Sequence, residues 1–140
     1  MGSILFVCTG NTCRSPMAEG LARELFGKTD VFSRGISAQN GGTASPQAVW
    51  VMSDVYGIDL SGHVPQRLTE ADVYAAEVIF TMTEAHKGHI SKLFPAVCDK
   101  LFTVGDEDIS DPFMSDVDVY AACAEEIKKC LETLYGPASQ

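Results

Sequence analysis

Apolar residues along the chain fall into two patterns, short unbroken runs and longer stretches with helical spacing. The run from Ser3 to Val7 has no polar alternation and stops at a Thr-Gly-Asn turn signal, which is typical of a strand buried on both faces. Similar short runs predict three further strands, at 31–37, 77–82 and 101–104.

Helices are predicted between these strands. Ser15 and Pro16 offer an N-cap and a proline at the first helical position, and the apolar stripe that follows them ends at Gly27. A second helix is predicted over 46–56, with Ser45 as its N-cap. The remaining helices are a short one that begins with the capping box 69–72, one from Thr83 to the residue before Pro95, and one from about Val117 to Tyr135 that Gly136 and Pro137 close.

The alternation of strands and helices predicts the fold class. Strands that are separated by helical segments form parallel βαβ units. We therefore expect a single α/β domain over residues 1–140, with an open four-stranded parallel sheet and helices on both faces. In such sheets, ligands bind beyond the carboxyl ends of the strands, which is where the turn after Val7 lies.

Composition and charge narrow the class of partner. A chain of 140 residues, 46% of them hydrophobic, can bury a core without disulfide or metal staples. No apolar run approaches the roughly 20 residues that span a bilayer. The chain has 10 basic and 19 acidic residues, a net charge of −9, which argues against nucleic acid as a partner. We expect a monomer that binds neither nucleic acid nor membrane.

The five cysteines indicate a reducing compartment. Their number is odd, their spacing is wide and no CxxC pair occurs, so a disulfide framework is not predicted and a cytoplasmic location is. Cys123 and Cys130 are seven residues apart in a helical pattern, so both are predicted to be core thiols.

The first turn combines a thiol, a cation and a helix start in the segment Cys8–Pro16, CTGNTCRSP. Backbone N–H groups of a loop that leads into a helix bind an anion, helped by the positive end of the helix dipole. The same field favours the thiolate of Cys8, and Arg14 can grip two oxygens of a phosphoryl group. Gly10 permits close backbone approach, and Asn11 tolerates a left-handed conformation. The segment predicts a phosphate-binding loop whose nucleophile forms a phosphocysteine.

A general acid is expected on a loop that faces this turn, because an amine or phenol leaves poorly without a proton. Asp111 is the candidate, since Pro112 restricts it to an extended conformation and Phe113 offers an aromatic wall. The alternative is that Asp111 is only one acid of a solvated turn.

The whole chain resembles the low-molecular-weight protein tyrosine phosphatases. The resemblance rests on the segment Cys8–Pro16, on its place after the first strand, and on the Asp-Pro-aromatic sequence at 111–113. It implies Cys8 as the nucleophile, Arg14 as a phosphate ligand, and Asp111 as general acid and then general base.

The same resemblance implies supporting residues around the loop. A hydroxyl of Ser15 would donate to the Cys8 thiolate, and His63 would be a partner of Asn11 behind the substrate site. The implied substrate-binding residues are Thr9, Gly10, Asn11, Thr12, Cys13, Ser15 and Phe113.

Two departures from the family pattern concern the substrate. Tyrosine-specific members usually have an aliphatic residue at the position of Thr12 and a tyrosine or tryptophan at that of Phe113. The Thr-plus-Phe combination resembles the protein-arginine phosphatase branch, because a threonine hydroxyl can bond a guanidino group. We therefore expect phosphoarginine in proteins as the substrate, with phosphotyrosine as the alternative. The acidic loop 105–118 would favour arginine-rich proteins, although solubility explains it equally well.

Two other functions stay open at this point. A thioredoxin-coupled arsenate reductase shares the CTGNxCRS motif, but it carries resolving cysteines near 81–90, where this chain has none. A non-catalytic module that binds phosphoproteins would also use such a loop.

Further thiols and imidazoles suggest additional chemistry. Cys13 is a candidate to form a reversible disulfide with Cys8, or else it packs the loop. His86 and His89 are three residues apart, but no acid or thiol lies at a metal-binding spacing, so a solvated helix face is favoured. We expect neither a metal nor a cofactor.

Overall fold

The computed structural model describes residues 3–27 and 30–135. Its elements in chain order are β1 (Ser3–Cys8), α1 (Arg14–Phe26), β2 (Asp30–Gly35), α2 (Pro46–Tyr56), α3 (Glu70–Ala75), β3 (Val78–Thr81), α4 (Glu84–Leu93), the 3-10 helix η1 (Pro95–Lys100), β4 (Leu101–Thr103) and α5 (Val117–Tyr135).

The four strands form one parallel sheet in the order β2-β1-β3-β4. From β1 the chain first adds β2 on one side and later adds β3 and β4 on the other, so the direction of winding reverses at β1. Such a reversal leaves the carboxyl end of the central strand open to a ligand. Cys8 is the last residue of β1 and lies at this point.

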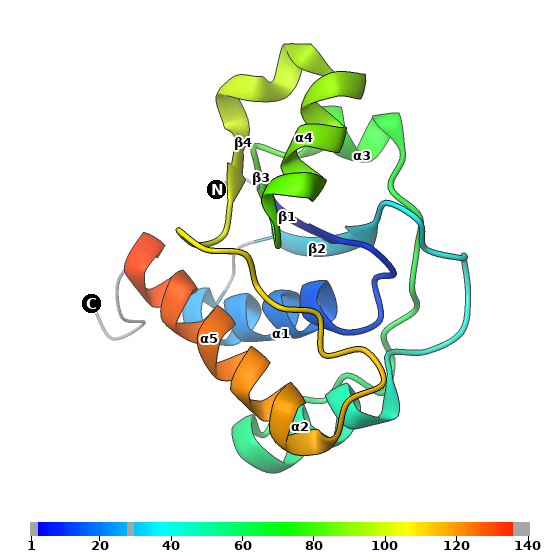
Figure 1. Ribbon diagram of the computed structural model, residues 1–140, viewed down its shortest axis with the longest axis vertical. Coiled ribbons are helices and arrows are strands. Elements are labelled where there is room, and N and C mark those ends of the chain that lie inside the picture. Colours follow the sequence, from blue (N-terminus) through cyan, green and yellow to red (C-terminus); the bar gives the residue numbers. More distant parts are fainter. Residues whose placement is uncertain (1–2, 28–29, 136–140) are drawn as a thin grey trace.

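Helices cover both faces of the sheet (Figure 1). Ile4, Phe6 and Cys8 belong to the apolar core shared with α1, α2 and α5, which lie on one side of the sheet in Figure 1. Leu5 and Val7 point to the other side, where they join a smaller core with residues of α3 and α4. Because both faces are packed, β1 is apolar throughout. The predicted α/β fold with a four-stranded parallel sheet is confirmed.

Some local predictions were wrong. Ser15 is not the N-cap of α1: the helix begins at Arg14, Cys13 holds the N-cap position, and the Ser15 hydroxyl lies against the Cys8 sulfur instead. Ser45 does precede α2, but its side chain makes no capping hydrogen bond. The segment after Pro95 forms η1, for which the apolar pattern gave no signal.

The other differences are smaller. Cys123 is buried as predicted, whereas Cys130 is only half-buried. Strand β2 ends at Gly35, two residues before the predicted boundary, because the chain there turns to bond the loop after β1. The predicted helix stop at Gly136 and Pro137 lies outside the described residues.

Candidate active site

The loop after β1 is fixed by the segment after β2. Ile36 N–H donates to the Cys8 carbonyl and Ser37 N–H to the Thr9 carbonyl, both at 2.9 Å. Gly35 makes this approach possible, because a Cβ at that position would lie 2.7 Å from the Thr9 carbonyl oxygen and 2.8 Å from the Asn11 nitrogen. The loop therefore rests directly on the backbone of its neighbour.

Asn11 gives the loop its curvature. It has a φ of 57°, in the left-handed region that asparagine tolerates better than most residues. The turn brings the Asn11 N–H to 3.3 Å from the Cys8 sulfur, so that the backbone amide points at the thiol.

Every polar group of the Asn11 side chain has a partner. Its Nδ2 donates to the hydroxyls of Ser15 at 2.9 Å and Ser33 at 3.0 Å, and its Oδ1 accepts the Gln66 N–H at 2.9 Å. Its backbone carbonyl accepts Nε2–H of His63 at 2.8 Å. This fully buried side chain therefore holds the left-handed turn in place.

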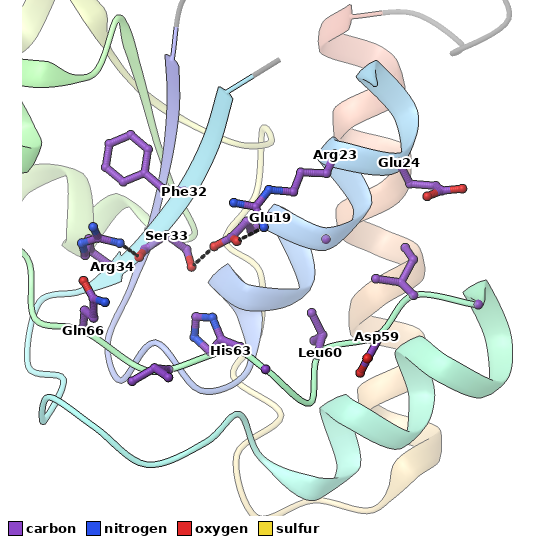
Figure 2. A pocket seen from close by; sticks show the side chains of 15 residues that line it. Glu19, Arg23, Glu24, Phe32, Ser33, Arg34, Asp59, Leu60, His63 and Gln66 are labelled. Atoms are coloured by element: carbon purple, nitrogen blue, oxygen red, sulfur yellow. Dashed lines mark hydrogen bonds and ion pairs between the residues drawn. The ribbon is translucent and has the colours of Figure 1, made fainter. Parts of the chain in front are cut away.

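Three partners of Asn11, namely Ser33, His63 and Gln66, line a cavity of about 610 Å3, shown in Figure 2. Ser33 donates to Glu19 at 2.6 Å, and Glu19 pairs with Arg23 at 2.7 Å. His63 and Gln66 lie on the loop that borders the cavity. Cys8 is not among the residues that line this cavity, so the cavity lies behind the loop that follows β1.

A smaller cavity, of about 170 Å3, brings together the candidate catalytic residues that the sequence indicates. It is lined by Cys8, Thr9, Gly10, Thr12, Cys13, Arg14, Asp111 and Phe113. The structure thus brings the two loops together, although about a hundred residues separate them in the chain. Asn11, Ser15 and His63 lie behind this cavity and support it.

Opposing effects act on the pKa of the Cys8 thiol. Only 2% of the residue is exposed, and burial raises the pKa of its thiol. Four groups oppose the increase in pKa: the Ser15 hydroxyl at 2.8 Å, the Ser15 backbone amide, the positive charge of Arg14 and the Asn11 amide. These are the groups that would stabilise a thiolate.

Arg14 connects the loop to the acidic segment. Its side chain is buried, its Nη1 donates to the Ile109 carbonyl at 2.8 Å, and its Nη2 lies 3.7 Å from Asp111 Oδ2. The guanidinium is therefore oriented before any ligand binds. A planar cation held in this way suits two phosphoryl oxygens.

Asp111 stands at the open side of the cavity, with its side chain about half exposed. Its Oδ1 accepts the Phe113 N–H at 3.1 Å, and the Ser115 N–H donates to the Pro112 carbonyl at 2.8 Å. Met114 completes this turn with a φ of 66°. The turn leaves the other carboxylate oxygen of Asp111 toward Arg14 and the cavity.

Two contacts of the site were missed by sequence reasoning. The Tyr120 hydroxyl, from α5, lies 3.2 Å from the Cys13 sulfur, and burial together with this contact raises the pKa of Tyr120 to about 12. The prediction that His86 lies on a solvated helix face was wrong: the residue is buried, and its Nε2 lies 2.9 Å from the Thr9 hydroxyl. Both contacts join positions 77 or more residues apart, so no local spacing signals them.

Residues 3–27 and 30–135 contain neither a membrane-spanning helix nor a cluster of metal-binding side chains. In that part of the chain, no helix is long and apolar enough to cross a membrane. Nor do three or more His, Cys, Asp or Glu side chains gather there in a way that would hold a metal ion.

A family model described as low molecular weight phosphotyrosine protein phosphatase matches residues 3–139. The chain belongs to this family. The prediction of an enzyme, a low-molecular-weight protein phosphatase, is confirmed. Phosphorylated proteins are accordingly its class of substrate.

The relatives of this phosphatase are named after two different substrates. A probable low molecular weight protein-tyrosine-phosphatase, EpsP of Ralstonia nicotianae, is 39% identical over 91% of this chain and 89% of its own. A protein-arginine-phosphatase of Bacillus subtilis is 37% identical over 94% and 93%. Among solved structures, a YwlE arginine phosphatase mutant with a phosphorylated active site serine is 36% identical, with a TM-score of 0.89 over 99% of this chain and 94% of that one.

Proposed function

We propose that this phosphatase hydrolyses phosphoarginine in proteins, through a phosphocysteine formed on Cys8. The observation that carries the mechanism is the small cavity, in which Cys8, Arg14 and Asp111 are all lining residues. The phosphorylated active site serine of the YwlE mutant supports covalent transfer in a relative.

The first step transfers the phosphoryl group to Cys8. The thiolate attacks phosphorus, the S–P bond forms and the P–N bond to the guanidino group breaks. Asp111, protonated at this stage, gives its proton to the departing nitrogen. Arg14 and the loop amides bind the phosphoryl oxygens as charge develops on them, which lowers the barrier.

The second step releases the phosphate. Asp111, now a carboxylate, takes a proton from a water molecule, and the resulting hydroxide attacks phosphorus. The S–P bond breaks and the thiolate of Cys8 is restored. The Ser15 hydroxyl, 2.8 Å from the sulfur, stabilises this leaving thiolate by donating to it.

Thr12 supports the choice of phosphoarginine. It lines the cavity, and its backbone is fixed because its carbonyl accepts the Ser45 N–H at 2.9 Å. A hydroxyl at this place can accept an N–H of a guanidino group, whereas an aliphatic side chain would leave that N–H without a partner. The acidic residues of the loop 105–118 other than Asp111 favour an arginine-rich substrate protein as well.

Phosphotyrosine is the second candidate, and Phe113 is the observation in its favour. The residue lines the cavity and is 60% exposed, so a phenol ring of a substrate can stack against its ring. The tyrosine phosphatase relative EpsP also supports this candidate.

The test is kcat/KM on two peptides of the same sequence, one with phosphoarginine and one with phosphotyrosine, for the wild type and for Thr12→Ile. We expect a preference for phosphoarginine that Thr12→Ile reverses. Cys8→Ser is the control for contaminating activity and should hydrolyse neither peptide while still binding phosphate. A wild-type preference for phosphotyrosine would refute the proposed substrate, and normal activity of Cys8→Ser would refute the mechanism.

A further inference from the structure

His86 is a buried imidazole next to the phosphate-binding loop. Only 8% of it is exposed, and its Nε2 lies 2.9 Å from Oγ1 of Thr9. It sits in the first turn of α4, where its N–H donates to the Thr83 hydroxyl at 3.1 Å. This hydrogen bond at the start of the helix fixes the backbone position from which the imidazole extends.

The other ring nitrogen of His86 has no partner. In the part of the chain that the structure describes, Nδ1 is the one buried side-chain nitrogen or oxygen atom without a hydrogen bond. A buried N–H without a partner is rarer and costs more than a buried lone pair without one. The ring proton therefore belongs on Nε2, which donates to Thr9, and Nδ1 carries the lone pair.

The charges around His86 agree with a neutral ring. Burial, followed by the nearby positive charge of Arg14, lowers the pKa of His86 to about 4. Asp108 and Asp111 act in the opposite direction but do not outweigh them. At neutral pH the ring therefore has one proton to donate, and Thr9 receives it.

This donation determines what the Thr9 hydroxyl can do. One lone pair of its oxygen is used by His86, so the hydroxyl proton remains free for an acceptor elsewhere. Thr9 lines the small cavity together with Cys8 and Arg14, so a phosphoryl group bound there would offer such an acceptor. The Thr9 carbonyl is held separately, by Ser37 N–H at 2.9 Å, so the residue is anchored on two sides.

We infer that His86 is a positioning residue that orients the Thr9 hydroxyl as a side-chain donor to a phosphoryl oxygen, in addition to the backbone amides of the loop. The inference rests on the proposed phosphoryl transfer, but it is independent of whether arginine or tyrosine carries the phosphoryl group. A donor that receives a hydrogen bond itself is a stronger donor, so the pair acts as a unit.

The experiment measures binding of orthovanadate and of inorganic phosphate by calorimetry, together with kcat and KM. In His86→Leu and in Thr9→Val we expect the Kd of orthovanadate to rise about tenfold, the effect of one lost charge-assisted hydrogen bond. His86→Gln should bind close to the wild-type value, because its amide N–H can replace Nε2–H, and Thr9→Ser keeps the hydroxyl. His89→Gln, on the same helix and exposed, is the matched control.

The double variant Thr9→Val with His86→Leu decides whether the two residues act together. If they do, the double variant binds orthovanadate no more weakly than Thr9→Val alone. Losses that add, or a His86→Leu variant that binds as the wild type does, would overturn the inference. Because anion binding is measured directly, this result stands even if neither phosphopeptide is hydrolysed, which would refute the proposed function instead.

Discussion

The Ser15 hydroxyl lies 2.8 Å from the Cys8 sulfur, although Cys8 ends a strand and Ser15 is in the first turn of a helix. The loop between them curves so tightly that its two ends meet. Ser15 is in turn bonded by Asn11 Nδ2, so its hydroxyl proton is directed toward the sulfur.

Ser15→Ala should make Cys8 less reactive. The substitution removes a hydrogen bond that favours the thiolate, so the pKa of Cys8 rises further above its ordinary value. We expect alkylation of Cys8 by iodoacetamide at pH 7 to slow by about tenfold. The measurement is the alkylation rate as a function of pH, with Ser45→Ala, near Cys13, as the control. An unchanged profile would show that Ser15 does not act on the thiolate.

Asp111→Asn should lower kcat without weakening substrate binding. The amide keeps the shape of the side chain but cannot donate or take up the proton, so kcat should fall by roughly 100-fold or more. Substrate binding, which depends on Arg14 and the loop amides, should change little. Single-turnover kinetics check both parts, with Asp116→Asn as a control on the same loop. A kcat within twofold of the wild type would exclude Asp111 as the general acid.

Gly35→Ala should destabilise the protein through a backbone clash. The added Cβ would lie 2.7 Å from the Thr9 carbonyl oxygen and 2.8 Å from the Asn11 nitrogen, neither of which can rotate away. We expect a loss of about 1–3 kcal/mol of unfolding free energy and weaker phosphate binding. Gly62→Ala is the matched control, because a Cβ there meets no atom within 4 Å. Equal urea midpoints for the two variants would contradict the clash.

His86 should make the fold sensitive to acid. In the native state its pKa is about 4, whereas an unfolded histidine titrates near 6.5. Between these values the unfolded state binds more protons, so stability falls as pH falls from 6.5 toward 4, by up to about 3 kcal/mol. Urea unfolding of the wild type and of His86→Gln across this range isolates the effect. Parallel stability curves would mean that His86 is not held neutral.

The sequence indicated the candidate site best where its residues are neighbours in the chain. The apolar run of β1, the tight turn and Arg14 follow one another, so a phosphate-binding loop could be proposed from them without a structure. Asp111 was selected because proline and an aromatic residue follow it directly, and the structure places it in the same cavity as Cys8 and Arg14. The family resemblance then covered the same residues.

Contacts between distant segments were beyond such reasoning. His86 was interpreted as a surface histidine, since nothing in the spacing of α4 shows that it reaches Thr9. Ser15 was taken for an N-cap because serine before proline is a helix-start signal, and its competing partner, the Cys8 sulfur, becomes evident only when the loop closes. Local signals describe what a residue prefers, and tertiary contacts decide which preference is met.

The contact between Tyr120 and Cys13 has a consequence for how the protein is made. Tyr120 lies in the first turn of α5, the last element that the structure describes, and α5 packs on α1 and α2. The phosphate-binding loop near the N-terminus is therefore synthesised early, whereas its contact with Tyr120 forms only after α5 has been synthesised. While α5 is still inside the ribosome, the nascent chain lacks this brace, so we expect the thiols of the loop to be more exposed to oxidants during translation than after release.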